Sequence, residues 1–217
     1  MRSHFFTVNE IFKSIQGEST YTGLPCVFIR FTGCNLRCSY CDTGYAYAEG
    51  FTLKTEELIN RVKAMGPKLV ELTGGEPLLQ KGIGVLSKAL LDQDMHVLVE
   101  TNGTQPIRMV DSRAIVIMDI KTPGSNVVVD KTLYNNLDNL RYHDQVKFVI
   151  TDKSDYEWSK TFIKKFDLSR MCTVLMSPAF GIVEPQDLVT WILNDNLLVR
   201  LNLQIHKYIW SPQQRGV

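Results

Sequence analysis

Residues 31–43 read FTGCNLRCSYCDT, and this stretch constrains both the fold and the chemistry of the chain. It contains three cysteines, Cys34, Cys38 and Cys41, with the spacing C-x3-C-x2-C. Thiolates this close in sequence can converge on one soft-metal centre, and structural zinc sites and [4Fe–4S] clusters normally take four protein ligands. Because the stretch offers three thiols, we expect one iron to stay open to a non-protein ligand.

A zinc knuckle or an iron–sulfur electron carrier is the alternative from a different functional class. Either would need a fourth protein ligand, for which Cys26 and Cys172 are the candidates. Both lie in apolar segments, where cysteine is more often a small core residue. Five cysteines with three clustered indicate a metal site in a reducing compartment, not a disulfide framework.

Composition limits the class of protein. The 217 residues are 44% hydrophobic and 22% charged, which predicts a single domain over residues 1–217 with a sizeable core. A net charge of +1 argues against nucleic acid as the main partner. The first residues do not resemble a signal peptide and no stretch has the apolar length of a membrane span, so we expect a cytoplasmic protein without a membrane partner.

Apolar runs alternate with amphipathic segments along most of the chain. Strands are predicted at 26–32, 69–73, 95–101, 114–120, 145–151, 172–176 and 198–205. Helices are predicted at 55–65, 79–91, 154–166 and 186–193. Residues 9–25 are predicted to be irregular. This order calls for parallel strands with right-handed crossovers, which favours an α/β fold, either a partial (β/α) barrel of mostly parallel strands or an open sheet.

A second motif, Gly74-Gly75-Glu76-Pro77, follows the strand at 69–73. Two glycines let the backbone approach a ligand closely, and Glu76 could accept hydrogen bonds from an ammonium group. Alone, the motif is most often a plain turn. Polar residues also follow the other predicted strands, and in parallel α/β folds ligands bind at that edge of the sheet.

Together the two motifs resemble the radical S-adenosylmethionine (SAM) superfamily, in which SAM chelates the fourth iron. More of the chain resembles one family within it, the 7-carboxy-7-deazaguanine synthases. The segments that carry this resemblance are 10–18, 23–25, 28–30, 33–38, 41–43, 71–77, 100–103 and 204–210. It implies conversion of 6-carboxy-5,6,7,8-tetrahydropterin to 7-carboxy-7-deazaguanine with loss of ammonia, in 7-deazapurine biosynthesis. It also implies a radical SAM fold, a homodimer and an electron donor such as flavodoxin or ferredoxin.

The resemblance assigns site residues in three groups. A [4Fe–4S] cluster is held by Cys34, Cys38 and Cys41, and Mg2+ by the hydroxyl of Thr43. Contacts to SAM are implied for Gly75, Glu76, Asp119, Lys121, Ser177 and Pro178. Contacts to the substrate are implied for Ile15, Gln16, Gly17, Glu18, Arg30, Thr73 and His206.

Elementary chemistry is consistent with these roles. The fork of Arg30 suits a pterin carboxylate, the amide of Gln16 suits the pterin edge, and a Thr43 hydroxyl with substrate oxygens suits Mg2+. Other interpretations stay open: Arg30 as a surface charge, His206 as a structural histidine, and Glu100 with Lys121 as a mutual ion pair. A glycyl-radical activase is the alternative enzyme, and it should lack the front segment 16–30.

Two positions depart from the family pattern. Ser19 stands where the family commonly has glycine, and Tyr40 where it often has tryptophan. A serine restricts the backbone more than glycine does, so the path of this loop is left open.

Overall fold

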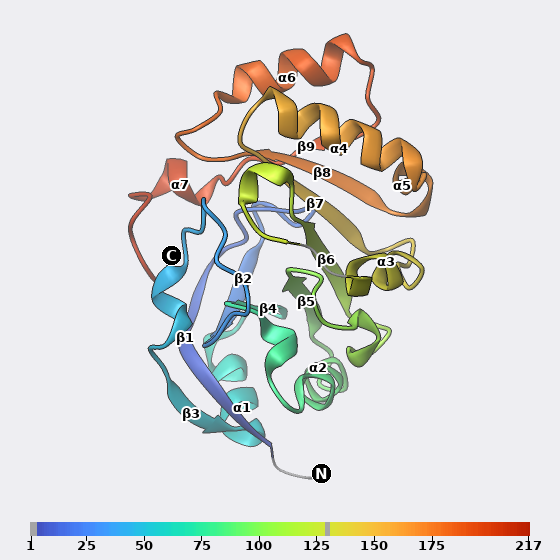
Figure 1. The fold of residues 1–217 in the computed structure, drawn as a ribbon. Helices are drawn as coiled ribbons and strands as arrows, with labels where there is room; N and C mark the ends of the chain where they lie inside the picture. Colours follow the sequence, from blue (N-terminus) through green and yellow to red (C-terminus); the bar gives the residue numbers. More distant parts are fainter. Residues whose placement is uncertain (1–3, 129–130) are drawn as a thin grey trace.

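One mixed sheet runs through the computed structural model, which describes residues 4–128 and 131–217. Its strands are β1 (Phe5–Ile15), β2 (Pro25–Phe31), β3 (Phe51–Lys54), β4 (Leu69–Gly74), β5 (His96–Thr101), β6 (Ile115–Ile120), β7 (Gln145–Ile150), β8 (Thr173–Pro178) and β9 (Arg200–Leu201). They lie in the order β3-β1-β2-β4-β5-β6-β7-β8-β9 (Figure 1). From β2 to β9 every pairing is parallel, and only β1 is antiparallel to its neighbours in this sheet. The predicted α/β fold with a partial barrel of mostly parallel strands is confirmed.

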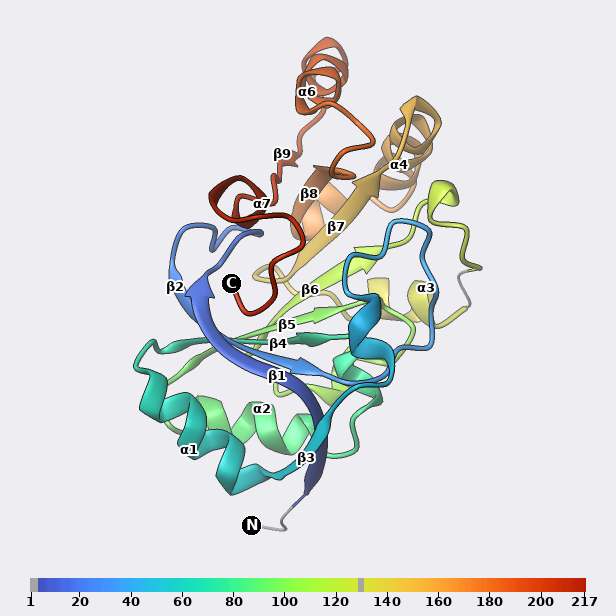
Figure 2. The same ribbon diagram turned by 90° about the vertical axis from the view of Figure 1, so that its left-hand side faces the viewer.

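Helices connect most of the strands and, except for the last one, which lies beside the cavity, they cover the outer face of this sheet. They are α1 (Thr55–Met65), α2 (Ile83–Leu91), α3 (Lys131–Leu137), α4 (Lys153–Lys165), α5 (Leu168–Met171), α6 (Pro185–Asn194) and α7 (His206–Ile209). In α1, Leu58 and Val62 share a buried face one turn apart, and the helix ends at Gly66, whose φ is 102°. Figure 2 shows α1 and α2 side by side against the sheet. The main core cluster lies in this layer, and burying each such side chain contributes roughly 1.5–3 kcal/mol.

The inner face of the sheet changes from apolar to polar along its central strands β4 and β5. Leu69 belongs to a small apolar cluster on this face, and Glu71 and Thr73 follow it at intervals of two residues. Leu98 and Glu100 repeat the pattern in β5. Because alternate side chains of a strand point to the same face, the apolar residues form a floor and the polar ones gather towards the carboxyl ends. The register of the parallel strands therefore brings the predicted site residues to one rim.

The prediction for residues 9–25 was wrong in part, because β1 extends over Phe5–Ile15. Its side chains do not alternate strictly between buried and exposed, since the strand carries Glu10, Lys13 and Ser14 and is only half-buried. The backbone N–H and C=O groups of β1 form hydrogen bonds with β2 on one side and β3 on the other. Tertiary pairing therefore decided a strand that the pattern of hydrophobic residues does not show.

Other predicted element boundaries also differ from the observed ones. The helix predicted from residue 79 begins only at Ile83, because Gly82 adopts φ 94° and interrupts it. The last predicted strand is reduced to Arg200–Leu201 at the sheet edge. The elements β3, α3, α5 and α7 were not predicted. The remaining predicted strands and helices are confirmed to within one or two residues. Within the described residues, no helix has the length and apolar character needed to cross a membrane.

Candidate active site

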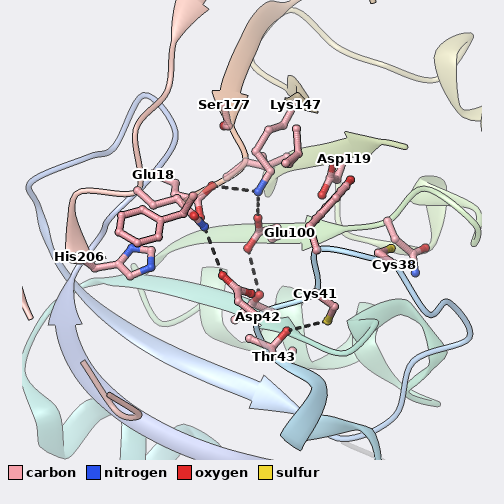
Figure 3. A pocket seen from close by; sticks show the side chains of 18 of the residues that line it. Glu18, Cys38, Cys41, Asp42, Thr43, Glu100, Asp119, Lys147, Ser177 and His206 are labelled. Atoms are coloured by element: carbon pink, nitrogen blue, oxygen red, sulfur yellow. Dashed lines mark hydrogen bonds and ion pairs between the residues drawn. The ribbon is translucent and has the colours of Figure 1, made fainter. Parts of the chain in front are cut away.

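A cavity of about 510 Å3 lies at the carboxyl ends of the parallel strands. Figure 3 shows side chains from several strands and from the cysteine loop turned towards it. The predicted site residues that line it are Ile15, Gln16, Glu18, Arg30, Cys34, Cys38, Cys41, Thr43, Thr73, Gly75, Asp119, Lys121, Ser177, Pro178 and His206. Two predicted residues, Gly17 and Glu76, do not line it. The fold therefore gathers into one cavity groups that lie as far apart in the sequence as Ile15 and His206.

The three clustered cysteines lie on the loop that follows β2. Cys34 and Cys38 are half-buried, and Cys41 is exposed. The Cys34 sulfur accepts hydrogen bonds from Leu36 N at 3.4 Å and from Asn102 Nδ2 at 3.7 Å. Burial raises the pKa of the Cys34 and Cys38 thiols, so binding of a metal must displace their protons.

The number of thiols at the cavity suits a [4Fe–4S] cluster with one open iron. Within the described residues, three cysteines line the cavity, whereas a structural zinc site normally takes four protein ligands. Cys26 and Cys172 are buried in the core and do not line the cavity, so neither supplies the fourth ligand that a zinc site needs.

The Gly-Gly-Glu turn packs closely against the cysteine loop. A Cβ on Gly75 would lie 2.1 Å from the Gly33 carbonyl oxygen, so a larger residue cannot pack there. Glu76 is fully buried, and its carboxylate accepts hydrogen bonds from Leu78 N at 2.9 Å, Thr101 Oγ1 at 2.7 Å and Asn102 N at 2.7 Å. Glu76 therefore faces the protein interior and connects the turn to the residue that contacts the Cys34 sulfur.

Two polar atoms beside the cysteine loop have no partner within the described residues. They are Asp119 Oδ1 and Tyr40 Oη, both buried in the cavity wall. The other oxygen of Asp119 pairs with Lys121 Nζ at 2.6 Å, and that ammonium lies 5.5 Å from the centre of the Tyr40 ring. A buried group without a partner is costly, so this wall fits a ligand that supplies hydrogen bonds.

Arg30 points its guanidinium into the cavity from β2. Its Nε donates to Glu10 Oε1 at 2.7 Å, and the same oxygen accepts from Tyr45 Oη at 2.9 Å. Its side chain is only 15% exposed, so it is not a surface charge. Glu10 thus fixes the guanidinium through Nε, and because no described residue bonds the Nη groups of Arg30, these can bind an anionic ligand.

The loop after β1 packs against the end of the chain. Ile205 N donates to the Gly17 carbonyl at 3.0 Å, and a Cβ on Gly17 would lie 2.1 Å from His206 Nδ1. Burial lowers the pKa of His206, which favours the neutral imidazole. The chain end is also tied to the cysteine loop, because Lys207 Nζ pairs with Asp42 Oδ2 at 2.6 Å.

The polar residues beneath the cavity form a charged network. Lys147 pairs with Glu18 and with Glu100 (Figure 3). Gln16 donates a hydrogen bond to Glu71. Burial alone would raise the pKa of Glu100, but Lys147 lowers it to about 2. Burial and the Glu100 charge together raise the pKa of Glu71 well above its usual range. Glu71 therefore holds a proton next to an ionised Glu100. Because Glu100 pairs with Lys147 and Lys121 with Asp119, the alternative of a Glu100–Lys121 ion pair was wrong.

Comparison with known proteins identifies the family. The model of the radical SAM superfamily matches residues 28–123. The 7-carboxy-7-deazaguanine synthases of Koribacter versatilis and Chlorobaculum tepidum are 41% and 43% identical to this chain, over 97% of its length and 99% and 96% of theirs. The chain belongs to the 7-carboxy-7-deazaguanine synthase family. The crystal structure of QueE from Escherichia coli is similar in fold, with a TM-score of 0.73 at 20% identity over 92% of this chain and 93% of that one.

Membership of the 7-carboxy-7-deazaguanine synthases disfavours the two alternatives. The alignments with these synthases cover 97% of the chain, whereas an activase was expected to lack the front segment 16–30. The zinc or electron-carrier alternative lacks a fourth cysteine at the cavity within the described residues.

The position where the synthases commonly have glycine has an unusual backbone. Ser19 adopts φ 65°, in the left-handed region that favours glycine. Two hydrogen bonds hold it there: Ser19 N donates to Asn202 Oδ1 at 2.7 Å, and Ser19 Oγ accepts from Tyr21 N at 3.1 Å. The loop therefore follows a path natural for glycine although serine occupies it.

Sequence reasoning missed Lys147 and Glu71, both of which line the cavity. Each is a charged residue inside an otherwise apolar strand, in QVKFVI and LVELTG respectively. A buried charge is costly unless it is paired, so a lone charged residue in such a strand is a signal of a site or a network.

Proposed function

We propose that this cavity is the active site in which the chain converts 6-carboxy-5,6,7,8-tetrahydropterin to 7-carboxy-7-deazaguanine with loss of ammonia. The observation that carries the proposal is the shared cavity. The cysteine loop lines it together with Gln16 and Arg30 from the β1–β2 hairpin and with His206 from α7, far along the sequence. Family membership supports the same reaction.

Cys34, Cys38 and Cys41 would hold a [4Fe–4S] cluster, and SAM would occupy the open iron. When bound, these two groups supply the one-electron chemistry that starts a radical reaction. For SAM we propose contacts from the Gly75 backbone and from the partnerless oxygen of Asp119. Lys121, Ser177 and Pro178 complete the proposed SAM contacts on the same rim. Glu76 does not line the cavity; its buried hydrogen bonds hold the Gly-Gly-Glu turn in place.

The substrate is proposed to lie between Arg30 and the loop after β1. Arg30 would bind the pterin carboxylate through its two Nη groups, since Glu10 takes its Nε. Gln16, Glu18 and Thr73 offer donors and acceptors to the pterin ring. Ile15 and His206 line the same space, while Gly17 leaves room for the His206 ring.

Thr43 is the proposed protein ligand of Mg2+. Its hydroxyl lies 3.8 Å from the Cys41 sulfur, at the edge of the cavity. Mg2+ keeps several waters and is often bound by one or two protein oxygens and the substrate. A coordination shell made of the Thr43 hydroxyl, substrate oxygens and water fits this preference.

The same family resemblance is our ground for proposing a homodimer, a cytoplasmic location and flavodoxin or ferredoxin as the electron donor. Light scattering of the reconstituted protein tests the dimer directly.

An anaerobic assay tests the reaction. The reconstituted protein is mixed with carboxytetrahydropterin, SAM, Mg2+ and dithionite, and both the deazapurine product and 5′-deoxyadenosine are quantified. We expect both to form, with the product dependent on the pterin. If 5′-deoxyadenosine forms without the deazapurine, the proposed substrate is wrong although the radical chemistry holds.

A further inference from the structure

We propose that Lys147 is a positioning residue, which holds the carboxylate of Glu18 in the orientation that binds the pterin substrate. This inference rests on the proposed function, in which Glu18 contacts the substrate.

Lys147 is a buried cation between two carboxylates. Its side chain is 6% exposed and comes from the middle of β7. Its Nζ lies 3.0 Å from Glu18 Oε2 and also binds Glu100 Oε1 (Figure 3). The charges of Glu100 and Glu18 hold its pKa well above its usual range despite burial, so Lys147 stays charged. One ammonium thus joins the loop after β1 to the strands β5 and β7.

The Glu18 carboxylate is fixed from both sides. Gln204 Nε2 donates to Oε1 at 2.8 Å, and Asn202 Nδ2 donates to Oε2 at 3.3 Å, next to Lys147. Of these three partners only Lys147 carries a charge. Without it, Glu18 would lose its charge-assisted hydrogen bond, and two neutral amides would hold the carboxylate less tightly. The Glu18 and Glu100 carboxylates would also repel each other, which would destabilise the fold.

The same network reaches the second polar residue of this loop. Glu18 N donates to Gln16 Oε1 at 3.0 Å, and Gln16 Nε2 donates to Glu71. Gln16 and Glu18 are therefore fixed relative to each other, and Lys147 sets the position of the pair above the sheet. A positioned pair binds a flat heterocycle better than two mobile side chains, because less conformational entropy is lost on binding.

The test is Lys147→Met, which keeps the length of the side chain and removes its charge. The matched control is Lys68→Met, because the Lys68 side chain is 65% exposed and pairs with Asp94 away from the cavity. Both variants are reconstituted anaerobically, and iron content, melting temperature, KM for SAM and KM for carboxytetrahydropterin are measured. We expect at least a tenfold rise in KM for the pterin in Lys147→Met, with iron content and KM for SAM within twofold of the wild type. The control should match the wild type in all four.

A purely structural role predicts a different pattern. The double variant Lys147→Met/Glu100→Gln removes the repulsion as well as the cation, so it should recover the melting temperature. If Lys147 positions Glu18, its KM for the pterin stays raised; if Lys147 only stabilises the fold, that KM returns to the wild-type value and the inference fails. If Lys147→Met does not fold, the KM for the pterin of the double variant is the measurement that tests the inference. A wild-type protein that makes no deazapurine would overturn the proposed reaction, whereas an active wild type with unchanged KM in both variants would overturn this inference alone.

Discussion

At the scale of single residues, the site is built from charged groups whose partners are already in place. Arg30 is held by Glu10, Lys147 by two glutamates, and Asp119 by Lys121. Each pair is buried or nearly so, where an unpaired charge would cost several kcal/mol. Substitutions here therefore need matched controls that separate loss of binding from loss of folding.

Arg30→Ala is expected to weaken substrate binding and to leave the cluster intact. A charge-assisted hydrogen bond contributes about 1.5–3 kcal/mol, which corresponds to a rise of roughly 10- to 150-fold in KM for the pterin. Iron content and cleavage of SAM are measured alongside. Arg113→Ala is the control, because Arg113 is 49% exposed and pairs with Asp92 and Asp111 at the surface. Loss of iron in Arg30→Ala would contradict a substrate role.

Glu71→Gln is expected to change how stability depends on pH. Because the folded protein raises the pKa of Glu71 well above the 4.5 of the free side chain, folding retains a proton that the unfolded chain releases above that pH. This contribution is fully present below about pH 4.5 and is lost as pH rises towards the folded pKa. Glutamine can keep the hydrogen bonds but has no proton to lose, so its contribution to stability does not change with pH. The stability of the variant relative to the wild type should therefore increase between pH 5.5 and pH 8.

Urea unfolding at the two pH values measures this effect. Glu56→Gln, on the exposed side of α1, is the control and should show no such gain. A constant difference between Glu71→Gln and the wild type at both pH values would mean that Glu71 is ionised in the folded protein.

At the scale of elements, the loop after β1 closes the site against the end of the chain. Figure 2 shows the end of the chain, in red, beside the β1–β2 hairpin. The contacts between them are polar and short: Gly17 O to Ile205 N, Ser19 N to Asn202 Oδ1, and Glu18 to Gln204. These segments lie more than 180 residues apart in the sequence, so the site forms only when the first and last strands are in place.

Gly17→Ala is expected to disturb this closure. The added methyl group would lie 2.1 Å from His206 Nδ1, so His206 and the start of α7 must move. We expect kcat/KM for the pterin to fall about tenfold or more, equivalent to about 1.4 kcal/mol, with iron content unchanged.

The matched control is Gly44→Ala, near the other end of the cysteine loop. There the added methyl would lie 3.6 Å from Tyr47, an ordinary van der Waals contact. If both variants lose activity equally, the Gly17–His206 contact has no special role.

At the scale of the whole molecule, the parallel sheet separates structural from functional residues of the same type. Cys26 lies at the beginning of β2 and Cys172 just before β8, at the amino ends of their strands. Cys34 follows the carboxyl end of β2. Since parallel strands all end at the same edge, position along a strand decides which cysteines can reach the cavity.

The double variant Cys26→Ala/Cys172→Ala is therefore expected to keep the wild-type iron content after anaerobic reconstitution. Each truncation costs roughly 1 kcal/mol of stability, the central value for single substitutions. Iron analysis and the spectrum of the reduced protein check the prediction, with Cys38→Ala as the variant that should lose the cluster. A folded double variant without iron would show that a core cysteine is a ligand.

The chain's own pattern was sufficient for most strands and helices between residues 26 and 194, because apolar runs and helix ends are local signals. It was not sufficient for β3, α3 and α5. The three cysteines and the Gly-Gly-Glu turn were also visible, since their spacing is local. Strand β1 and the partners of Lys147 and Glu100 were not, because pairing across the sheet sets them. Which oxygen of Asp119 is free, and that Glu76 faces inward, likewise depend on contacts between distant segments. The sequence determined which chemical groups are present and which strands carry them, and the tertiary structure alone decided which of them meet, because register and closure are properties of the assembled sheet.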